Sequence, residues 1–162
     1  MSKYSSFNKG YKYIFAVVDV FSRQALCVAI KNKNSSSCTE ALKIIIEKKG
    51  QPRVLTSDND SAFLSGEFKS LTDKLGIILN LNVIGDHNAL GIIDNFAKRL
   101  KRIFTAIFLS KKKKNWLDYL DSVIEVYNDS EHKSLNYLTP NEAGLKENKE
   151  LIEEINFRNY KL

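Results

Sequence analysis

The feature that most constrains the fold is a strand-forming stretch near the start of the chain. Residues 11–23 (YKYIFAVVDVFSR) are rich in β-branched and aromatic side chains, which is typical of a buried strand, and we expect this strand to end near Asp19. Ser22 and Arg23 fit a tight turn, and residues 24–32 (QALCVAIKN) read as a second strand. The two strands predict a β-hairpin around which the rest of the chain must pack.

After this hairpin, segments with helical and strand-like patterns alternate. We expect a helix over 39–50 that ends at Gly50, a short strand within 53–60 that runs into a polar loop, a helix over 65–76, a strand over 77–84, a helix from 88 to about 109, and a helix over 115–128. Pro140 is expected at the start of a short helix within 139–145. The order β-β-α-β-α-β-α-α predicts an α/β domain with a mixed sheet and helices packed on it.

The length of 162 residues and the absence of a long Gly-, Pro- or Ser-rich linker predict one domain over residues 1–162. A chain of this size, with 43% hydrophobic residues, can bury a proper core without cross-links. Residues 146–162 are mostly polar, and we expect them to form a loosely packed C-terminal tail.

The charge balance favours a polyanionic partner. Lys and Arg number 25 against 19 Asp and Glu, which gives a net charge of +6 and a pI of about 9.2. Cys27 and Cys38 form no Cys-x-x-Cys pair, and the two histidines cannot complete a zinc site at the usual spacings, so we expect both thiols to be reduced and inert. No apolar run approaches about 18 residues, and residues 1–12 are polar, so we expect a soluble, intracellular protein without membrane association.

Three aspartates stand at the ends of predicted elements. Asp19 follows a buried strand, Asp58 follows the strand that includes Val54 and Leu55, and Asp94 lies in the first turns of a helix. Such positions can converge in space, and three carboxylates suit hard cations such as Mg²⁺ or Mn²⁺. Two such ions can clamp an in-line phosphoryl displacement.

Each aspartate also has a simpler interpretation. Asp19 could be a buried acid that backbone N–H groups satisfy, and Asp58 could belong to turn chemistry in residues 56–60 (TSDND). Asp94 could be an acid that the helix dipole favours in the first turn. Composition and periodicity leave these alternatives open.

Four sequence segments are similar to a known family: 9-KGYKYIFAVVDVFSR-23, 54-VLTSDNDSAF-63, 86-DHNALGIIDNFAKRLK-101 and 127-YNDSEHKSLNYLTPNEA-143. Over roughly residues 8–145 the chain resembles the catalytic core of retroviral-type integrases, most closely those of Maverick/Polinton transposons and virophages. The resemblance implies an RNase H-like α/β fold, with a mixed five-stranded sheet flanked by helices.

The resemblance also implies a catalytic, metal-binding triad of two aspartates and a glutamate, with 35 residues between the last two. Asp19 and Asp58 match the two aspartates, and because 35 residues separate Asp58 from Asp94, Asp94 matches the third acid. Asp86, with a gap of 27 residues, is the runner-up. The sequence departs from the family at Asp94, where glutamate is usual, and after Asp58, where the family often has glycine at position 60 and an acid at 62.

Lys98 and Lys101 follow Asp94 at spacings of four and three residues, so the three side chains share one face of the helix. The resemblance implies that these lysines contact the DNA end, whereas the simpler alternative is an Asp–Lys pair on a solvated face. Asn59 and His87 are further candidates for DNA contact.

Other residues receive structural interpretations. We expect Arg99 and Arg102 on plain surface, and Trp116 in the core or at a dimer interface. Lys111–Lys114 fit a solvated connection, with contact to target DNA as the alternative.

The resemblance implies the core of a DNA integrase, an enzyme of the polynucleotidyl transferase class. It would process the 3′ ends of transposon or viral DNA and transfer them into target DNA, with two Mg²⁺ or Mn²⁺ ions. The expected partners are double-stranded DNA, as element ends and target, and further copies of the chain in a homodimer or higher oligomer. The expected location is the nucleus, the viral particle or the cytoplasm of a host cell.

Two rival functions remain: an RNase H-like nuclease, and a catalytically impaired core kept as a DNA-binding or dimerisation module. The zinc-binding N-terminal domain and the C-terminal DNA-binding domain of the family have no counterpart in this sequence. We therefore expect an isolated core that lacks full strand-transfer activity.

Overall fold

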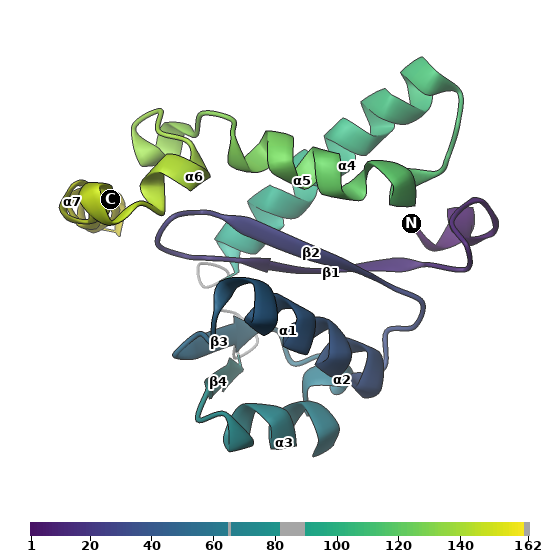
Figure 1. Ribbon diagram of the computed structural model, residues 1–162, viewed down its shortest axis with the longest axis horizontal. Helices are drawn as coiled ribbons and strands as arrows, with labels where there is room; N and C mark the ends of the chain where they lie inside the picture. The colour runs from purple at the N-terminus through teal and green to yellow at the C-terminus, as the bar shows by residue number, and fades with distance from the viewer. Residues whose placement is uncertain (65, 82–89, 161–162) are drawn as a thin grey trace.

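A computed structural model describes residues 1–64, 66–81 and 90–160 (Figure 1). In chain order the elements, with η for 3₁₀ helices, are η1 (Ser2–Phe7), β1 (Tyr13–Val18), β2 (Ala25–Ile30), α1 (Ser35–Lys49), β3 (Val54–Ser57), α2 (Ser61–Leu64), α3 (Gly66–Lys74), β4 (Ile78–Leu81), α4 (Gly91–Lys111), η2 (Trp116–Tyr119), α5 (Leu120–Asn128), η3 (Lys133–Leu135), α6 (Pro140–Ala143), η4 (Lys146–Asn148) and α7 (Lys149–Tyr160).

The predicted hairpin is confirmed. Strands β1 and β2 pair antiparallel, with Val18 opposite Ala25 next to the turn and Tyr13 opposite Ile30 at the far end. Arg23 closes the turn with a positive φ of 62°, a conformation that costs a side-chain-bearing residue energy, and its N–H donates to the Asp19 carbonyl at 2.8 Å.

The expected five-stranded sheet is not found in the described residues, which form two separate two-stranded sheets. Strands β3 and β4 pair in parallel and have only four residues each. Strand β2 leads directly into α1, because the Asn34 side chain accepts from the Ser37 N–H at 3.0 Å and caps this helix. The residues themselves predicted four strands, and the fifth came only from the resemblance. Residues 82–84 of the last predicted strand lie outside the described part.

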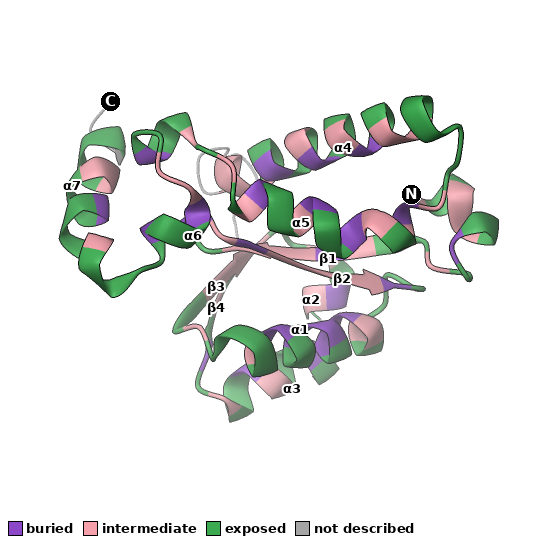
Figure 2. Ribbon diagram, turned by 45° about the horizontal axis from the view of Figure 1, so that its top comes forward, coloured by how far each residue is buried: buried purple, intermediate pink, exposed green. Residues whose placement is uncertain are grey.

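The β1–β2 hairpin lies between two helical layers, with α1 and α3 on one side and α4 and α5 on the other (Figure 1). The first core contains Phe15, Ile30, Leu42 and Phe68, among others, and the second contains Phe96, Phe104, Trp116 and Tyr127, among others. Trp116 is fully buried, so it belongs to the core rather than to an exposed interface. Figure 2 shows the buried residues along the helix faces that meet the hairpin.

The N-terminal segment is fastened to the connection between α4 and η2 by one buried side chain. Asn8 is 1% exposed, and its amide donates to the carbonyls of Tyr4 (2.7 Å) and Lys114 (2.8 Å). Its carbonyl oxygen accepts from the Leu117 N–H at 2.8 Å. These bonds satisfy backbone groups that would be costly to leave unpaired, so they hold residues 1–12 against the end of α4.

The C-terminal segment is ordered differently from the expected loose tail. Residues 149–160 form α7, and Ile152 is fully buried against Leu135 and Ala143. Although residues 146–162 are mostly polar, α7 has a short apolar face, and this face packs against Leu135 and Ala143. Within the described residues, no helix has the length and apolar character needed to cross a bilayer.

Candidate functional site

Asp19 lies in the hairpin turn, not inside the sheet. Strand β1 ends at Val18, and Asp19 is exposed. Its Oδ2 atom accepts from the Ser22 N–H at 2.9 Å and from the Ser22 hydroxyl at 2.6 Å. The alternative interpretation of Asp19 as a buried acid is therefore wrong, because the exposed carboxylate stabilises the hairpin turn.

Asp58 and Asn59 follow the end of β3 in the loop that leads to α2, and both are exposed. The Asp58 carbonyl accepts from the Ser57 hydroxyl at 3.1 Å, whereas the described structure shows no protein partner for the Asp58 carboxylate. Asp58 and Asp60 both lie just after the C-terminal end of β3, but of the two carboxylates only that of Asp60 accepts hydrogen bonds in the described structure.

Asp60 starts α2 and fixes the end of this loop. Its Oδ1 atom accepts from the Ala62 N–H at 3.0 Å, and its backbone carbonyl accepts from the Phe63 N–H at 2.9 Å. Its Oδ2 atom accepts a hydrogen bond from the Lys33 ammonium, which reaches across from the β2–α1 connection. The hydrogen bond from Lys33, and then the one from the Ala62 N–H, lower the pKa of Asp60 below its ordinary value.

Lys33 is a site residue that sequence reasoning missed. The hydrogen bond to Asp60 raises the pKa of Lys33, partial burial opposes this, and the carboxylates of Asp60 and Asp58 raise it further. The ammonium of Lys33 is therefore within electrostatic reach of Asp58. No local sequence pattern predicts this contact, because Lys33 and Asp60 are 27 positions apart.

Asp94 lies in the first turn of α4 and is exposed, as are Lys98 and Lys101. In the described part of the chain, no ion pair joins Asp94 to either lysine. The simpler expectation of an Asp–Lys pair on a solvated face is therefore not what the structure shows. The carboxylate and both cations are left available to a ligand.

The structure does not assemble the three aspartates into a metal site. Among the described residues, no group of three or more His, Cys, Asp or Glu side chains is placed to hold a metal ion. Asp58 and Asp94 offer oxygen donors of the kind that Mg²⁺ prefers, but the protein donors do not form a complete ligand set. His87 and Asp86, the other predicted candidates, lie outside the described residues.

Arg99 does not lie on plain surface as expected. Its guanidinium lies 5.1 Å from the centre of the Tyr127 ring and donates to His132 Nε2 at 2.9 Å, and the Tyr127 and His132 rings meet edge to face at 4.7 Å. Burial, and then the Arg99 cation, lower the pKa of His132. This cluster joins the middle of α4 to the end of α5 and disfavours the protonated form of His132.

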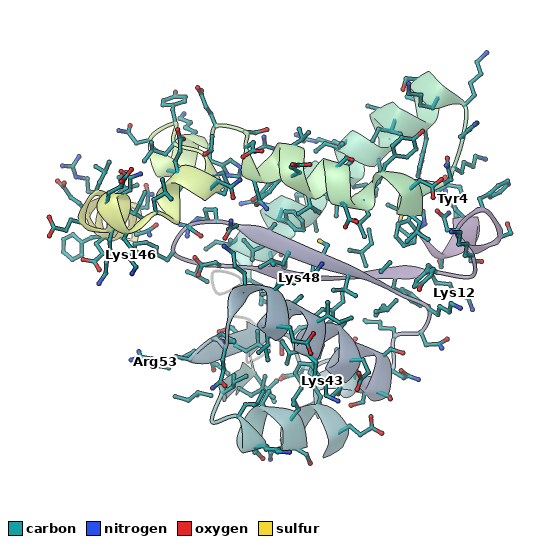
Figure 3. The ribbon with its side chains drawn as sticks, in the orientation of Figure 1. Tyr4, Lys12, Lys43, Lys48, Arg53 and Lys146 are labelled. Carbon is teal, nitrogen blue, oxygen red and sulfur yellow. The ribbon has the colours of Figure 1, made fainter. Side chains whose placement is uncertain are left out.

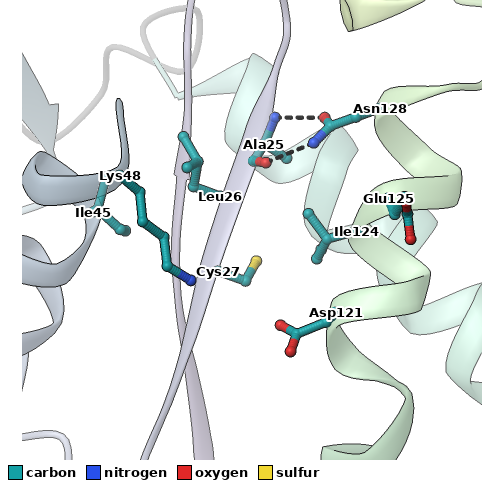
Figure 4. Close-up of a pocket in the computed structure, with 9 residues that line it drawn as sticks. All are labelled: Ala25, Leu26, Cys27, Ile45, Lys48, Asp121, Ile124, Glu125 and Asn128. Carbon is teal, nitrogen blue, oxygen red and sulfur yellow. Dashed lines mark hydrogen bonds between the residues drawn. The ribbon is translucent and has the colours of Figure 1, made fainter. Parts of the chain in front are cut away.

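A cavity of about 350 Å³ lies between β2, α1 and α5 (Figure 4). Burial, and then Asp121, raise the pKa of Cys27 to about 12, so its thiol is a poor nucleophile, as the sequence suggested. On the same wall the Asn128 amide accepts from the Ala25 N–H and donates to the Ala25 carbonyl, both at 2.9 Å. The cavity contains none of the predicted site residues.

A family model described as the integrase core domain matches residues 3–87, which is more than half of the chain. The matched range includes Asp19 and Asp58 but ends before Asp94.

Three curated relatives are similar over most of the chain. The chain is 29% identical over 116 residues to the Gag-Pol polyprotein of feline leukemia virus, covering 71% of the chain and 7% of the polyprotein. It is 28% identical over 109 residues to the Pol polyprotein of radiation murine leukemia virus (strain Kaplan), covering 67% and 19%. A putative uncharacterized transposon-derived protein of Caenorhabditis elegans is 24% identical over 136 residues, covering 83% and 47%. The chain spans less than half the length of each.

Solved structures share the fold. A simian T-cell lymphotropic virus intasome, in complex with the PP2A regulatory subunit B56 gamma, superposes with a TM-score of 0.67 at 22% identity, covering 71% of this chain and 41% of that chain. The HTLV-2 integrase catalytic core domain with magnesium, in its dimeric form, gives 0.63 at 22% identity, covering 75% and 78%. The RNase H-like α/β fold expected from the sequence is therefore confirmed, although the described strands form two small sheets.

The Lys33–Asp60 pair can be tested with a double-mutant cycle in which Lys33→Ala and Asp60→Asn are measured alone and together. Asparagine keeps an acceptor for the Ala62 N–H, so the cycle isolates the ion pair. We expect a coupling below about 1 kcal/mol in the free energy of unfolding by urea, since Lys33 is half exposed. The pair of Lys43 with Glu40 within α1 is the control, with a smaller coupling. Equal couplings for both pairs would contradict a special role for Lys33.

His132 predicts a pH dependence of stability. The unfolded chain protonates this residue near pH 6.5, whereas the folded chain does so only at lower pH. The stabilisation is complete above the unfolded value and is lost as the pH falls from there through the folded value. We expect His132→Gln to flatten the slope of the unfolding free energy in that window, measured by urea titration at several pH values. An unchanged slope would show that His132 does not titrate differently in the two states.

Proposed function

Because the chain belongs to the integrase core domain family, we propose that it is the catalytic core of a polynucleotidyl transferase that processes DNA 3′ ends and joins them to target DNA. One observation carries the proposal: Asp58 and Asp94 are exposed carboxylates for which the described residues show no hydrogen bond or ion pair, and the exposed cations Lys98 and Lys101 follow Asp94. The narrower assignment to Maverick, Polinton or virophage elements rests on the sequence motifs and is part of the proposal.

The described residues support phosphodiester chemistry in a specific way. Lys98 and Lys101 on the exposed face of α4 would neutralise phosphates of the DNA end, and Asn59 would donate to a phosphate or base from its loop. Asp58 and Asp94 are the proposed ligands of Mg²⁺ or Mn²⁺, an ion that polarises a phosphoryl oxygen when bound. Mg²⁺ commonly takes one or two protein carboxylates and completes its shell with substrate phosphates and water.

A second candidate function is a catalytically impaired core that binds DNA or forms dimers. It is supported by the absence of a three-carboxylate group among the described residues and by the engagement of Asp19 in the hairpin turn. An RNase H-like nuclease is the third candidate, since the fold is shared. The integrase core and the nuclease differ in the substrate that each would cleave, whereas the impaired core would bind DNA without cleaving it.

The proposal is tested with a branched DNA that mimics the product of integration, in Mn²⁺. We expect the chain to resolve this DNA, Asp58→Asn to lose at least about 100-fold in rate, because a charged metal ligand is removed, and Asp94→Glu to keep or raise the rate. Lys43→Gln, at an exposed position of α1 where Lys43 pairs with Glu40, is the control and keeps the rate. Cleavage of an RNA–DNA hybrid instead would support the nuclease, and DNA binding without any turnover would support the impaired core.

Two variants can distinguish a catalytic role of Asp19 from a purely structural role in the hairpin turn. Ser22→Ala removes the hydroxyl bond and leaves the Asp19 carboxylate intact, whereas Asp19→Asn removes the charge. If Asp19 acts only in the turn, which its geometry supports, both variants lose a similar 0.5–1.5 kcal/mol or so of stability and keep the rate on branched DNA. A loss of rate in Asp19→Asn alone would restore Asp19 to the catalytic set predicted from the sequence.

We also propose that the core works as a homodimer or higher oligomer on double-stranded DNA, in the nucleus or in a viral particle or the cytoplasm of a host cell. The dimeric form of the HTLV-2 core, a fold relative, supports the oligomer. Light scattering of the purified chain at high concentration should give a mass of at least twice 18.5 kDa. A single species of 18.5 kDa at every concentration would rule the oligomer out.

A further inference from the structure

Positive charge is concentrated in two stretches of the chain that contain no acid. Residues 1–18 and 95–117 together hold eleven Lys and Arg residues and no Asp or Glu. The rest of the chain holds 14 basic and 19 acidic residues. The net charge of +6 therefore conceals a strongly basic part and an acidic remainder, a division that a generally solvated surface does not require.

The fold brings these two stretches together at one end of the molecule. The Tyr4 ring meets the Phe108 ring edge to face at 5.2 Å, and the ammonium groups of Lys3 and Lys114 lie 5.1 and 5.4 Å from the centre of the same ring. The buried Asn8 amide holds the backbone at both Tyr4 and Lys114. The lysines of this end thus stand on an anchored segment rather than on a free tail (Figure 1).

Helix α4 connects the candidate site to the end of the molecule where Lys3, Lys9, Lys12 and Lys111–Lys114 lie, which we call the basic end. Asp94 is the only acid on α4, and it lies in the first turn, whereas Lys111 is the last residue of the helix. At 1.5 Å per residue the two lie about 25 Å apart along the axis. Lys98 and Lys101 lie between Asp94 and Lys111 on this helix and are exposed. Positively charged side chains are therefore present along α4 from the candidate site to the basic end.

We propose that this basic end, formed by Lys3, Lys9, Lys12 and Lys111–Lys114, binds the phosphate backbone of the same DNA duplex whose end lies at Asp58 and Asp94. The inference rests on the proposed function and adds a second contact to it. A distance of about 25 Å along α4 corresponds to about seven or eight base pairs at 3.4 Å each. The contact therefore lies inside the duplex, at a fixed distance from its processed end.

The surface fits a polyanion better than a solvated face. All seven lysines are exposed, and no ion pair engages any of them in the described structure. The closest acid along the chain is Asp118, whose carboxylate accepts from the Asn115 amide. Two exposed apolar side chains, Phe7 and Leu109, lie on the same two segments, so an anionic membrane is the competing partner that the experiment must separate.

The experiment measures equilibrium binding of fluorescent duplexes by anisotropy, with the full chain carrying Asp58→Asn so that no turnover occurs. One variant changes all four of Lys111–Lys114 to Gln. The matched control changes Lys49, Lys69, Lys74 and Lys146 to Gln, which removes the same charge from exposed positions outside the basic end. Figure 3 shows Lys146 at the opposite end of the molecule from Tyr4 and Lys12.

We expect the Lys111–Lys114 variant to bind a duplex of about 16 base pairs about 10- to 100-fold more weakly, and the salt dependence of log K to fall by about three. For a duplex of about six base pairs, too short to reach the basic end, we expect the variant and the control to bind alike. The control should stay within about threefold of the parent on both duplexes, because its lysines touch no phosphate.

Equal salt dependence in the variant and the control would overturn the inference while leaving the proposed function intact. Failure of the parent chain to bind any duplex would instead overturn the proposed function itself. Competition by phosphatidylserine vesicles as strong as that by DNA, without any dependence on duplex length, would overturn the DNA contact and assign the surface to a membrane.

Discussion

The architecture depends on one hairpin that is buried on both of its faces. Side chains alternate between the faces of a strand, so Phe15 and Val17 pack into the core beneath α1, whereas Ile14, Ala16 and Val18 pack into the core beneath α4 and α5. The β1–β2 hairpin therefore lies between two hydrophobic cores and contributes side chains to both. Because α4 packs on one face and α1 on the other, the hairpin positions both the helix that bears Asp94 and the β2–α1 connection that bears Lys33.

This double burial explains why the hairpin could be predicted from the sequence. A strand with apolar side chains on both faces is an unbroken apolar run, and residues 14–18 (IFAVV) are such a run. The helices followed from their periodicity and caps, although α1 begins at Ser35, earlier than expected, because Asn34 caps it. The end of this strand was also predicted, because the charged Asp19 interrupts the apolar run, and the expected end near Asp19 agrees with β1 ending at Val18.

The features that could not be predicted are contacts between distant segments. The Lys33–Asp60 pair and the Arg99–His132 contact join residues that are 27 and 33 positions apart, and each partner alone reads as an ordinary polar surface residue. The fifth strand is the opposite case, a feature that was predicted but is not found in the described residues. The family resemblance added a fifth strand that the residues did not predict, and the four described strands pair only two by two.

The Asn128 amide has a consequence for how this protein can associate with itself. By accepting from the Ala25 N–H and donating to its carbonyl, it occupies the positions that a neighbouring strand would use along the outer edge of β2. An incoming chain would have to break both bonds and move the end of α5 before it could pair there. Growth of this sheet by strand addition, the usual beginning of fibrous aggregation, is therefore obstructed at the turn end of β2 by a single side chain.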